Sequence, residues 1–162
     1  MLSLSPLTDA SRNRTFPAGW HEAHLSMTKE VVPLIDTFGV KMSTHGHAEK
    51  DVFGLRLALE EALVNAIKHG HRYDPSKRVA VRYCFQADCV LVEVEDQGPG
   101  FDPVAVPDPT DPENRERASG RGLFLMRAYA SWVRHNRRGN CVRLCKYSSR
   151  LRSPDRAGSG IG

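Results

Sequence analysis

One long segment with helical periodicity constrains the fold more than any other feature of this sequence. From Lys50 to His69, apolar residues recur at steps of three and four positions, and Gly70 follows directly. This spacing predicts an amphipathic helix that buries one face and ends at the glycine. The chain has 162 residues, of which 40% are hydrophobic, so it can bury one sizeable core. The apolar face of the helix therefore requires a second layer of structure to pack against.

Alternating segments later in the chain predict that second layer. Apolar and polar residues alternate over 79–85 and again over 90–95. The short connection between the two segments is typical of a β-hairpin. A final strand is expected over Cys141 to Tyr147, after the turn Arg138-Gly139-Asn140. These segments predict a sheet that can cover the helix.

Further elements complete the predicted order. The sequence predicts a short strand at about 21–27 and a helix over about 28–38, in which Pro33 is tolerated only in the first turn. Another helix is expected to begin after Gly122. The order is then strand, helix, helix, strand, strand, long loop, helix, strand. It predicts an α+β sandwich with helices on one face of a mixed, mainly antiparallel sheet.

The two ends of the chain differ in composition from the middle. Residues 1–19 are rich in Ser, Pro, Arg and Asn, and residues 148–162 are rich in Ser, Arg and Gly. We therefore expect a flexible arm over 1–19, one domain over 20–147 and a flexible tail over 148–162. The sequence shows neither a secretion signal nor an apolar run of about 18 residues, so a cytoplasmic location is expected and a membrane span is not.

Cysteines, histidines and net charge narrow the range of functions. The four cysteines form no Cys-x-x-Cys pair, so they are expected to be buried thiols in strands rather than zinc ligands. The seven histidines form no recognisable ligand set, and most are expected at the surface. The net charge of +4 is scattered or lies near the ends, which does not favour direct nucleic-acid binding. It is better suited to attracting an anionic nucleotide or an acidic partner protein.

The first polar motif lies within the long predicted helix. Glu61, Asn65 and Lys68 stand at i, i+4 and i+7, so a carboxylate, an amide and a cation share one stripe. Asparagine is unfavourable inside a helix, which suggests that its oxygen has a task such as binding Mg²⁺. Glu61 could accept a proton from an attacking hydroxyl group. The alternative is an ordinary polar helix edge with an exposed Glu/Lys pair.

Two glycine motifs follow further along the chain. Asp96 ends a predicted strand and precedes Gly98 and Gly100, where a backbone without side chains lets a flat base come close to a carboxylate. Gly120 and Gly122 directly precede a predicted helix whose free N–H groups could hold phosphates. The alternatives are a tight turn in the first case and a flexible loop before a helix in the second.

Taken in order, the three motifs resemble the N box, G1 box and G2 box of the GHKL ATPases. This superfamily includes DNA gyrase, Hsp90, histidine kinases and MutL, and it shares the Bergerat nucleotide-binding fold. The segments 61–70, 96–102 and 120–126 are most similar to the anti-sigma-factor serine kinases, bacterial regulators that phosphorylate an antagonist of the STAS type. Residues 139–146 also resemble the last strand of that group, so the resemblance covers nearly all of 20–146.

The resemblance implies ATP and Mg²⁺ as cofactors and a role for each matching residue. Glu61 would be the catalytic base, Asn65 would bind Mg²⁺, and Asp96 would recognise adenine. Gly98 and Gly100 would shape the base pocket. The other residues implied at the nucleotide lie where its phosphates are expected: Lys68, Arg117, Gly120, Arg121, Gly122 and Leu123.

The segment of about 102–119 would be the ATP lid, whose closure excludes water and couples the nucleotide to partner binding. This segment contains four prolines and is longer than the shortest lids of the family, and Arg121 places a cation inside the G2 glycine pair where relatives often carry other residues. Neither departure removes a required atom.

The resemblance thus predicts an ATP-dependent protein serine kinase that also sequesters its partner. The expected partners are a STAS-type antagonist and a sigma factor, and the family suggests a homodimer. Two alternatives stay open at this level: a nucleotide-dependent binding module without transfer, and a slow ATPase in which Glu61 activates water. The presence of Glu61 favours catalysis over binding alone.

Overall fold

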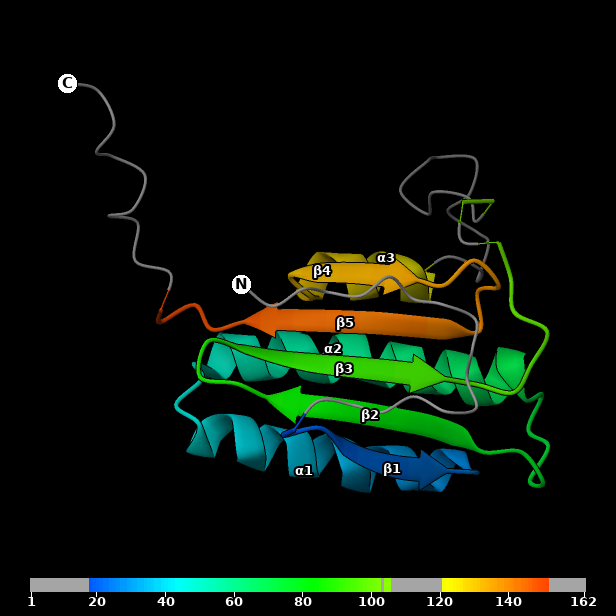
Figure 1. The fold of residues 1–162 in the computed structure, drawn as a ribbon, viewed down its shortest axis with the longest axis horizontal. Coiled ribbons are helices and arrows are strands. Elements are labelled where there is room, and N and C mark those ends of the chain that lie inside the picture. The colour runs from blue at the N-terminus through cyan, green and yellow to red at the C-terminus, as the bar shows by residue number, and fades with distance from the viewer. Residues whose placement is uncertain (1–17, 103, 106–120, 152–162) are drawn as a thin grey trace.

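A five-stranded antiparallel sheet forms one layer of the protein (Figure 1). The computed structural model describes residues 18–102, 104, 105 and 121–151. In the described chain the strand order is β1-β2-β3-β5-β4, and every neighbouring pair is antiparallel. The strands are β1 (His21–Leu25), β2 (Val79–Phe85), β3 (Cys89–Glu95), β4 (Trp132–His135) and β5 (Cys141–Tyr147).

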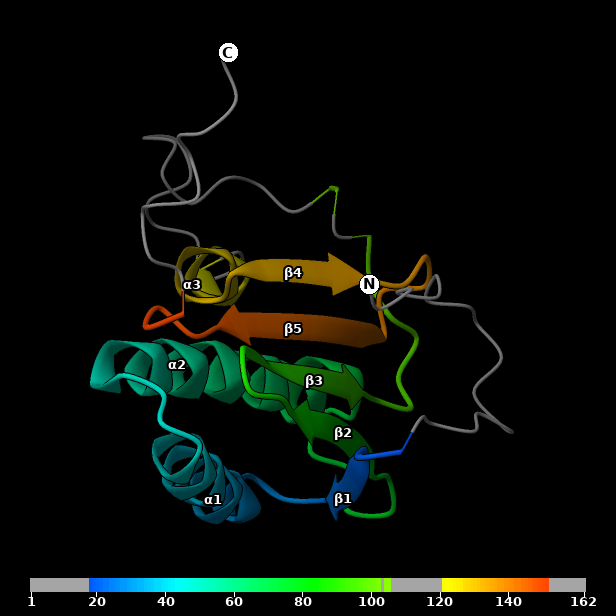
Figure 2. The same ribbon diagram turned by 60° about the vertical axis from the view of Figure 1, so that its left-hand side comes forward.

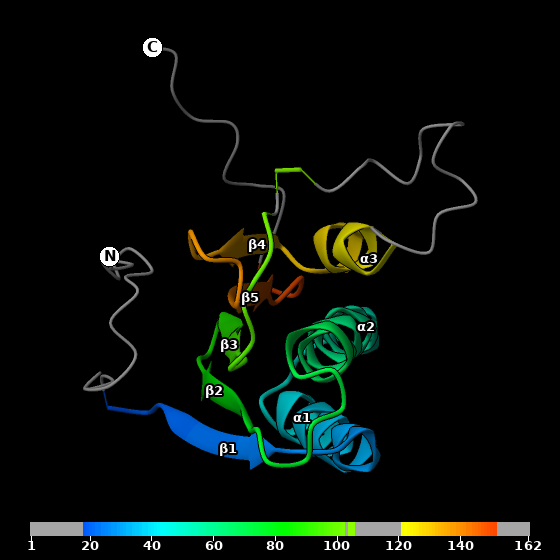
Figure 3. The same cartoon turned by 90° about the vertical axis from the view of Figure 1, so that its right-hand side faces the viewer.

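Helices form the second layer, on one face of this sheet (Figure 3). The α-helices are α1 (Val31–Thr44), α2 (Glu49–Asn65) and α3 (Arg121–Tyr129). A 3-10 turn, Thr28–Glu30, precedes α1, and a π-helical turn, Ala66–Gly70, continues α2. Figure 2 shows α2 lying between α1 and α3. The predicted α+β class, with helices on one face of the sheet, is confirmed.

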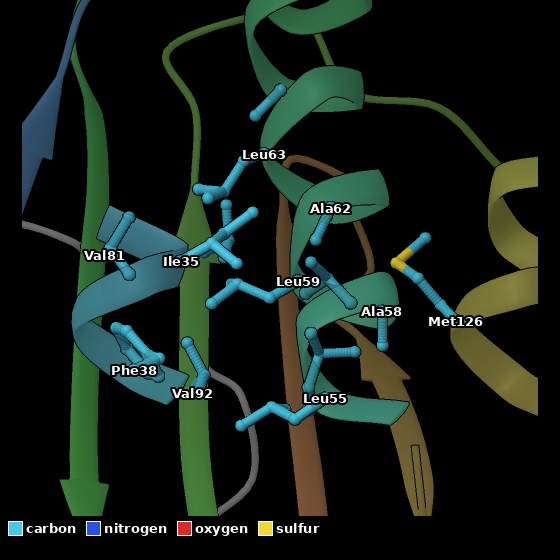
Figure 4. Close-up of a cluster of buried hydrophobic side chains, with 14 of the residues drawn as sticks. Ile35, Phe38, Leu55, Ala58, Leu59, Ala62, Leu63, Val81, Val92 and Met126 are labelled. Atoms are coloured by element: carbon cyan, nitrogen blue, oxygen red, sulfur yellow. The ribbon is translucent and has the colours of Figure 1, made fainter. Parts of the chain in front are cut away.

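The core lies between α2, α1 and the sheet (Figure 4). Leu55, Leu59 and Leu63 recur at steps of four along α2, and none has any exposed surface. Figure 4 shows Ile35 and Phe38 of α1 on one side of these leucines and Met126 of α3 on the other. Periodic apolar residues on α2 therefore bury a continuous stripe, as the sequence pattern predicts, and this stripe fixes how the three helices lie on the sheet.

The structure extends or corrects several predicted elements. The helix expected over 28–38 continues to Thr44, and Pro33 lies in its first turn as required. Strand β4 is not in the predicted order. It has only four residues and pairs with β5 at the edge of the sheet, so its short pattern gave no strand signal. The long helix ends as a π turn rather than as regular α-helix up to Gly70.

The face of the sheet opposite the helices carries a charged network. Glu93 of β3 is fully buried and accepts hydrogen bonds from Arg82 at 3.1 Å and from Arg143 at 2.6 Å. Arg82 also donates to Glu22 and Glu95, both at 2.7 Å. Because both arginines bond to the same buried carboxylate, they link β2, β3 and β5 across this face.

All four cysteines are buried in strands, as predicted, and none of them forms a disulfide bond. The expected surface location holds for most of the histidines, but His47 and His71 are buried. Among the described helices, none has the length and apolar character needed to cross a membrane.

Candidate functional site

Residues of all three sequence motifs line one pocket at one end of the sandwich: Asn65 of α2, Asp96 and Gly100 after β3, and Gly122 of α3. The C-terminal end of α2, the exit of β3 and the turn between β4 and β5 lie at the same end of the molecule, on the right in Figure 1. A pocket of about 310 Å³ opens there. It is lined mainly by apolar or small residues, with a few polar groups among them: Ala62, Asn65, Ala66, His69, Gly70, Val94, Asp96, Gly100, Phe101, Gly122, Leu123, Met126, His135, Gly139, Asn140, Cys141 and Val142.

Asp96 provides the carboxylate of this pocket. It follows the last residue of β3, and its Oδ1 accepts a hydrogen bond from the Gly98 N–H at 2.7 Å. Burial raises the pKa of Asp96 from 3.8 to about 6, although the Gly98 hydrogen bond opposes the shift. The side chain is therefore mainly ionised at neutral pH and presents an acceptor to the pocket.

Two glycines allow this carboxylate to approach α2. A β-carbon at Gly70 would lie 2.5 Å from Asp96 Oδ1, and one at Gly98 would overlap the Gly70 carbonyl oxygen. A larger residue at Gly98 would therefore require the Gly70 backbone to move, and one at Gly70 would displace the Asp96 carboxylate. The predicted role of Gly98 in shaping the base pocket has a clear steric basis, although Gly98 lies beside the pocket lining rather than in it.

The wall near Asp96 is suited to a flat apolar ring. The ring of Phe101 packs edge-on against His135, with ring centroids 5.4 Å apart. Burial lowers the pKa of His135 to about 4, so this histidine is neutral at physiological pH. A neutral imidazole among apolar residues adds little charge to this wall.

Glu61, Asn65 and the start of α3 lie together at another part of the site. A β-carbon at Gly122 would be 2.7 Å from Glu61 Oε2 and 2.9 Å from Asn65 Nδ2. Burial, and then the neighbouring Glu60 charge, raise the pKa of Glu61. Within the part of the chain that the structure describes, neither Glu61 nor Asn65 has a side-chain hydrogen-bond partner. Both groups are therefore available to an incoming ligand.

A π-helical turn follows Asn65 directly. It covers Ala66–Gly70, and turns of this kind are rare and often occur at functional sites. Lys68 lies within this turn and not in the regular α-helix that the i, i+4, i+7 spacing assumes. Lys68 is exposed and does not line the pocket.

The structure thus brings together part of the predicted residue set. Of the predicted residues, five line the pocket: Asn65, Asp96, Gly100, Gly122 and Leu123. Glu61 and Gly98 are next to them, and Arg121 is exposed at the first position of α3. Arg117, Gly120 and most of the expected lid over 102–119 lie outside the described residues. The roles of all these residues stay predictions.

Sequence reasoning missed several polar residues that support the site. Asn140 lines the pocket, and its Nδ2 donates to the Asp96 carbonyl oxygen at 2.9 Å. On the other side, Nε2 of the buried His71 accepts a hydrogen bond from the Gln97 N–H at 3.0 Å. Burial lowers the pKa of His71, which keeps it in the neutral form that can accept. Only the position of His71, two residues after His69, could have signalled its place beside the motif.

Comparison with known families agrees with this geometry. Residues 27–146 match the family model of the histidine kinase-like ATPase domain. The serine-protein kinase RsbW of Bacillus licheniformis is 31% identical over 123 residues, which are 70% of this chain and 75% of that protein. The serine-protein kinase RsbW of Staphylococcus epidermidis is 29% identical over 136 residues, covering 78% of this chain and 85% of the relative.

A solved structure has a similar fold. It contains the RsbU and RsbW domains of Rv1364c from Mycobacterium tuberculosis, and it superposes with a TM-score of 0.52 at 16% sequence identity. The match covers 78% of this chain but only 32% of that longer one. At this identity the likeness supports the fold alone.

Proposed function

The chain belongs to the histidine kinase-like ATPase domain family, and from this premise we propose that it binds Mg-ATP and phosphorylates a serine of a partner protein. The observation that carries the proposal is the convergence of Asn65, Asp96 and Gly122 on one pocket, although they come from three separate segments of the chain. The names of the RsbW relatives support a protein kinase of the GHKL type.

The pocket has the chemistry that an adenine ring needs. Its walls are largely apolar, and Asp96 supplies one buried acceptor for the 6-amino group of the base. A hydrogen bond between a charged acceptor and an amine in such a site contributes about 1.5–3 kcal/mol. We propose that Asp96, which precedes Gly98 and Gly100, distinguishes adenine from bases that lack this donor.

The phosphates would lie towards α3. Leu123 and Gly122 stand in its first turn, where backbone N–H groups favour anions, and we propose that Lys68, Arg117, Gly120 and Arg121 contribute around the same groups. Asn65 offers the neutral oxygen ligand that Mg²⁺ accepts, and it has no competing partner among the described residues. When bound, Mg²⁺ would offset the negative charge of the phosphates.

Glu61 is proposed to hold the proton of the acceptor hydroxyl group. Its Oε2 is next to Gly122, at the end of the site assigned to the phosphates. The raised pKa of this carboxyl group makes it a better base than an exposed glutamate. Orienting the serine hydroxyl and accepting its proton at Oε2 is the step that this residue can perform.

The partner assignment rests on the relatives. We propose that the phosphorylated protein is an antagonist of the STAS type, that a sigma factor is the regulated target, and that the protein acts in the cytoplasm, as a homodimer. Direct binding of nucleic acid is not part of the proposal, because the net charge of +4 is scattered along the chain.

The proposal is tested first by calorimetric titration of ATP into the protein, with and without Mg²⁺. We expect binding that depends on Mg²⁺ and is lost in Asp96→Asn. Radiolabelled ATP and candidate STAS proteins then test transfer, with Glu61→Gln as the matched variant that binds ATP but does not transfer. Binding without transfer would instead support a nucleotide-dependent binding module. Release of free phosphate without a labelled protein would support a slow ATPase.

A further inference from the structure

Two asparagines in the turn between β4 and β5 hold the backbone of Asp96. The Asp96 N–H donates to the carbonyl oxygen of Asn140 at 2.9 Å, and the Asp96 carbonyl oxygen accepts from Asn140 Nδ2 at 2.9 Å. Both main-chain polar groups of Asp96 are therefore bonded to one residue. With its backbone fixed in this way, the carboxylate can move only about its own side-chain bonds.

A second asparagine sets the orientation of the first. Asn136 Oδ1 accepts the N–H groups of Gly139 at 2.8 Å and Cys141 at 3.3 Å, so its Nδ2 faces Asn140. There it donates to Asn140 Oδ1 at 2.9 Å. This contact leaves Nδ2 of Asn140 as the group that faces Asp96.

Both asparagines of this hydrogen-bond network are buried. Asn136 is 7% exposed and Asn140 is 8% exposed, so water cannot readily replace a lost partner. Each amide uses its oxygen and its nitrogen within the network. If the donor at Asn136 is replaced by an acceptor, the Asn140 amide must therefore change its orientation, because water cannot readily take the place of the lost partner.

The turn and the loop after Asp96 also interlock through their backbones. Gly100 has φ +80° and Gly139 has φ +74°. A β-carbon at Gly100 would overlap the Arg138 carbonyl oxygen, and one at Gly139 would overlap the Phe101 carbonyl oxygen. Arg138 Nη2 further donates to the Gly98 carbonyl oxygen at 3.2 Å. The β4–β5 turn therefore packs directly against the loop that follows Asp96 and restricts its conformation.

We propose that Asn136 and Asn140 are positioning residues that set the preference of the pocket for a base with a 6-amino group, by holding Asp96 in place. The inference rests on the proposed function. The inference goes beyond the proposed function because it assigns base selectivity to a series of hydrogen bonds that begins at Asn136, outside the pocket lining. Asn140 lines the pocket, but its amide is used by Asn136 and Asp96, so it acts through Asp96.

The main test uses Asn136→Asp. This variant keeps the size of the side chain and the acceptor for the Gly139 and Cys141 N–H groups, but it removes the donor to Asn140. The Asn140 amide must then rotate and present its oxygen to the Asp96 carbonyl, which removes one hold on Asp96. Asn140→Ala removes the hydrogen bond to the Asp96 carbonyl directly. If Asn140→Ala does not fold, the result for Asn136→Asp alone tests the inference.

Two nucleotides serve as probes in calorimetric titrations: ATP, and purine riboside triphosphate, which lacks the 6-amino group. We expect the unaltered protein to bind ATP about 10-fold to 100-fold more tightly than the second probe, the ratio for one hydrogen bond to a charged group. Asn136→Asp should reduce this ratio to about threefold or less, through weaker ATP binding with nearly unchanged binding of purine riboside triphosphate.

Ser149→Ala is the matched control. It removes the hydrogen bond that the Ser149 hydroxyl donates to Asp51 at 2.8 Å, which links the segment after β5 to the start of α2. The ratio of the two nucleotide affinities should stay unchanged. Equal weakening of both nucleotides by Asn136→Asp, or an unchanged ratio, would overturn the inference while leaving ATP binding established. If the unaltered protein does not bind ATP, the proposed function fails and the inference fails with it.

Discussion

Replacing Asp96 by asparagine should stabilise the unliganded protein while abolishing its affinity for ATP. Burial raises the pKa of Asp96 from 3.8 to about 6. Because each pH unit between the unfolded and folded pKa corresponds to about 1.4 kcal/mol, the ionised carboxylate costs the folded state up to about 3 kcal/mol at pH 7.5. Asparagine carries no charge and keeps an oxygen for the Gly98 N–H, which lies 2.7 Å from Asp96 Oδ1. The expected gain in unfolding free energy is about 1–3 kcal/mol.

The sign of the pH dependence follows from the raised pKa. Below about pH 3.8 the carboxyl group is protonated in both states, so the cost is absent. Between pH 3.8 and about 6, Asp96 is already ionised in the unfolded chain but still protonated in the folded protein. The free energy of unfolding therefore falls as pH rises through this range. The advantage of Asp96→Asn should therefore be small at pH 4 and complete at pH 7.5.

Urea denaturation at both pH values, followed by the fluorescence of Trp20 and Trp132, measures the difference. Calorimetry on the same samples measures ATP binding. A variant that is no more stable than the unaltered protein at pH 7.5, or whose advantage is the same at pH 4, would refute the argument that burial of this charge is costly. The result would also remove the reason for expecting a poised acceptor in the pocket.

Three further predictions follow from other contacts. ATP should bind about tenfold more weakly at pH 5 than at pH 7.5 in calorimetric titrations, because only about a tenth of Asp96 is ionised one pH unit below its pKa of about 6. Gly122→Ala should weaken Mg²⁺-dependent ATP binding in the same titrations, since the new β-carbon would lie 2.9 Å from Asn65 Nδ2; unchanged binding would contradict the close approach of α3. Glu93→Ala should lower the unfolding free energy by about 3 kcal/mol in urea melts, because Arg143 loses the buried carboxylate that it contacts while Arg82 keeps Glu22 and Glu95, and a loss under 1 kcal/mol would contradict that role.

The parts of the fold that the sequence predicted are those with strong local periodicity. The α2 segment and the β2–β3 hairpin have patterns that alternate with the right period, because each buries one face against the same core. Strand β4 was missed because its four residues include the exposed Arg134, and its pairing with β5 is set by tertiary contacts. The π turn was missed for a similar reason: no residue in 66–70 signals a wider turn.

The residues of the candidate site also divide into those that local sequence motifs predict and those that only tertiary contacts bring to the site. Glu61, Asn65 and Asp96 stand in motifs whose residue types suggest a chemistry before any fold is known. Asn136 and Asn140 carry no such signal, since an asparagine near a glycine is an ordinary turn residue. Their place in the site depends on which strands are neighbours, because only the β3–β5 pairing brings the turn next to Asp96.

The two ends of the pocket differ in how they are built, and this difference has a functional consequence. At the base end, Asp96 is held by hydrogen bonds to its backbone and by interlocked loops, all within segments packed on the sheet. At the other end, Glu61 and Asn65 have no side-chain hydrogen-bond partners among the described residues, and a β-carbon at Gly122 of α3 would lie within 3 Å of both side chains. The hydrogen bonds that hold the Asp96 backbone come from the β4–β5 turn and not from α3, so the proposed recognition of the base depends on the turn rather than on Glu61 and Asn65. Substitutions at the turn should therefore change which nucleotide binds, whereas substitutions at Glu61 should change what happens to it afterwards.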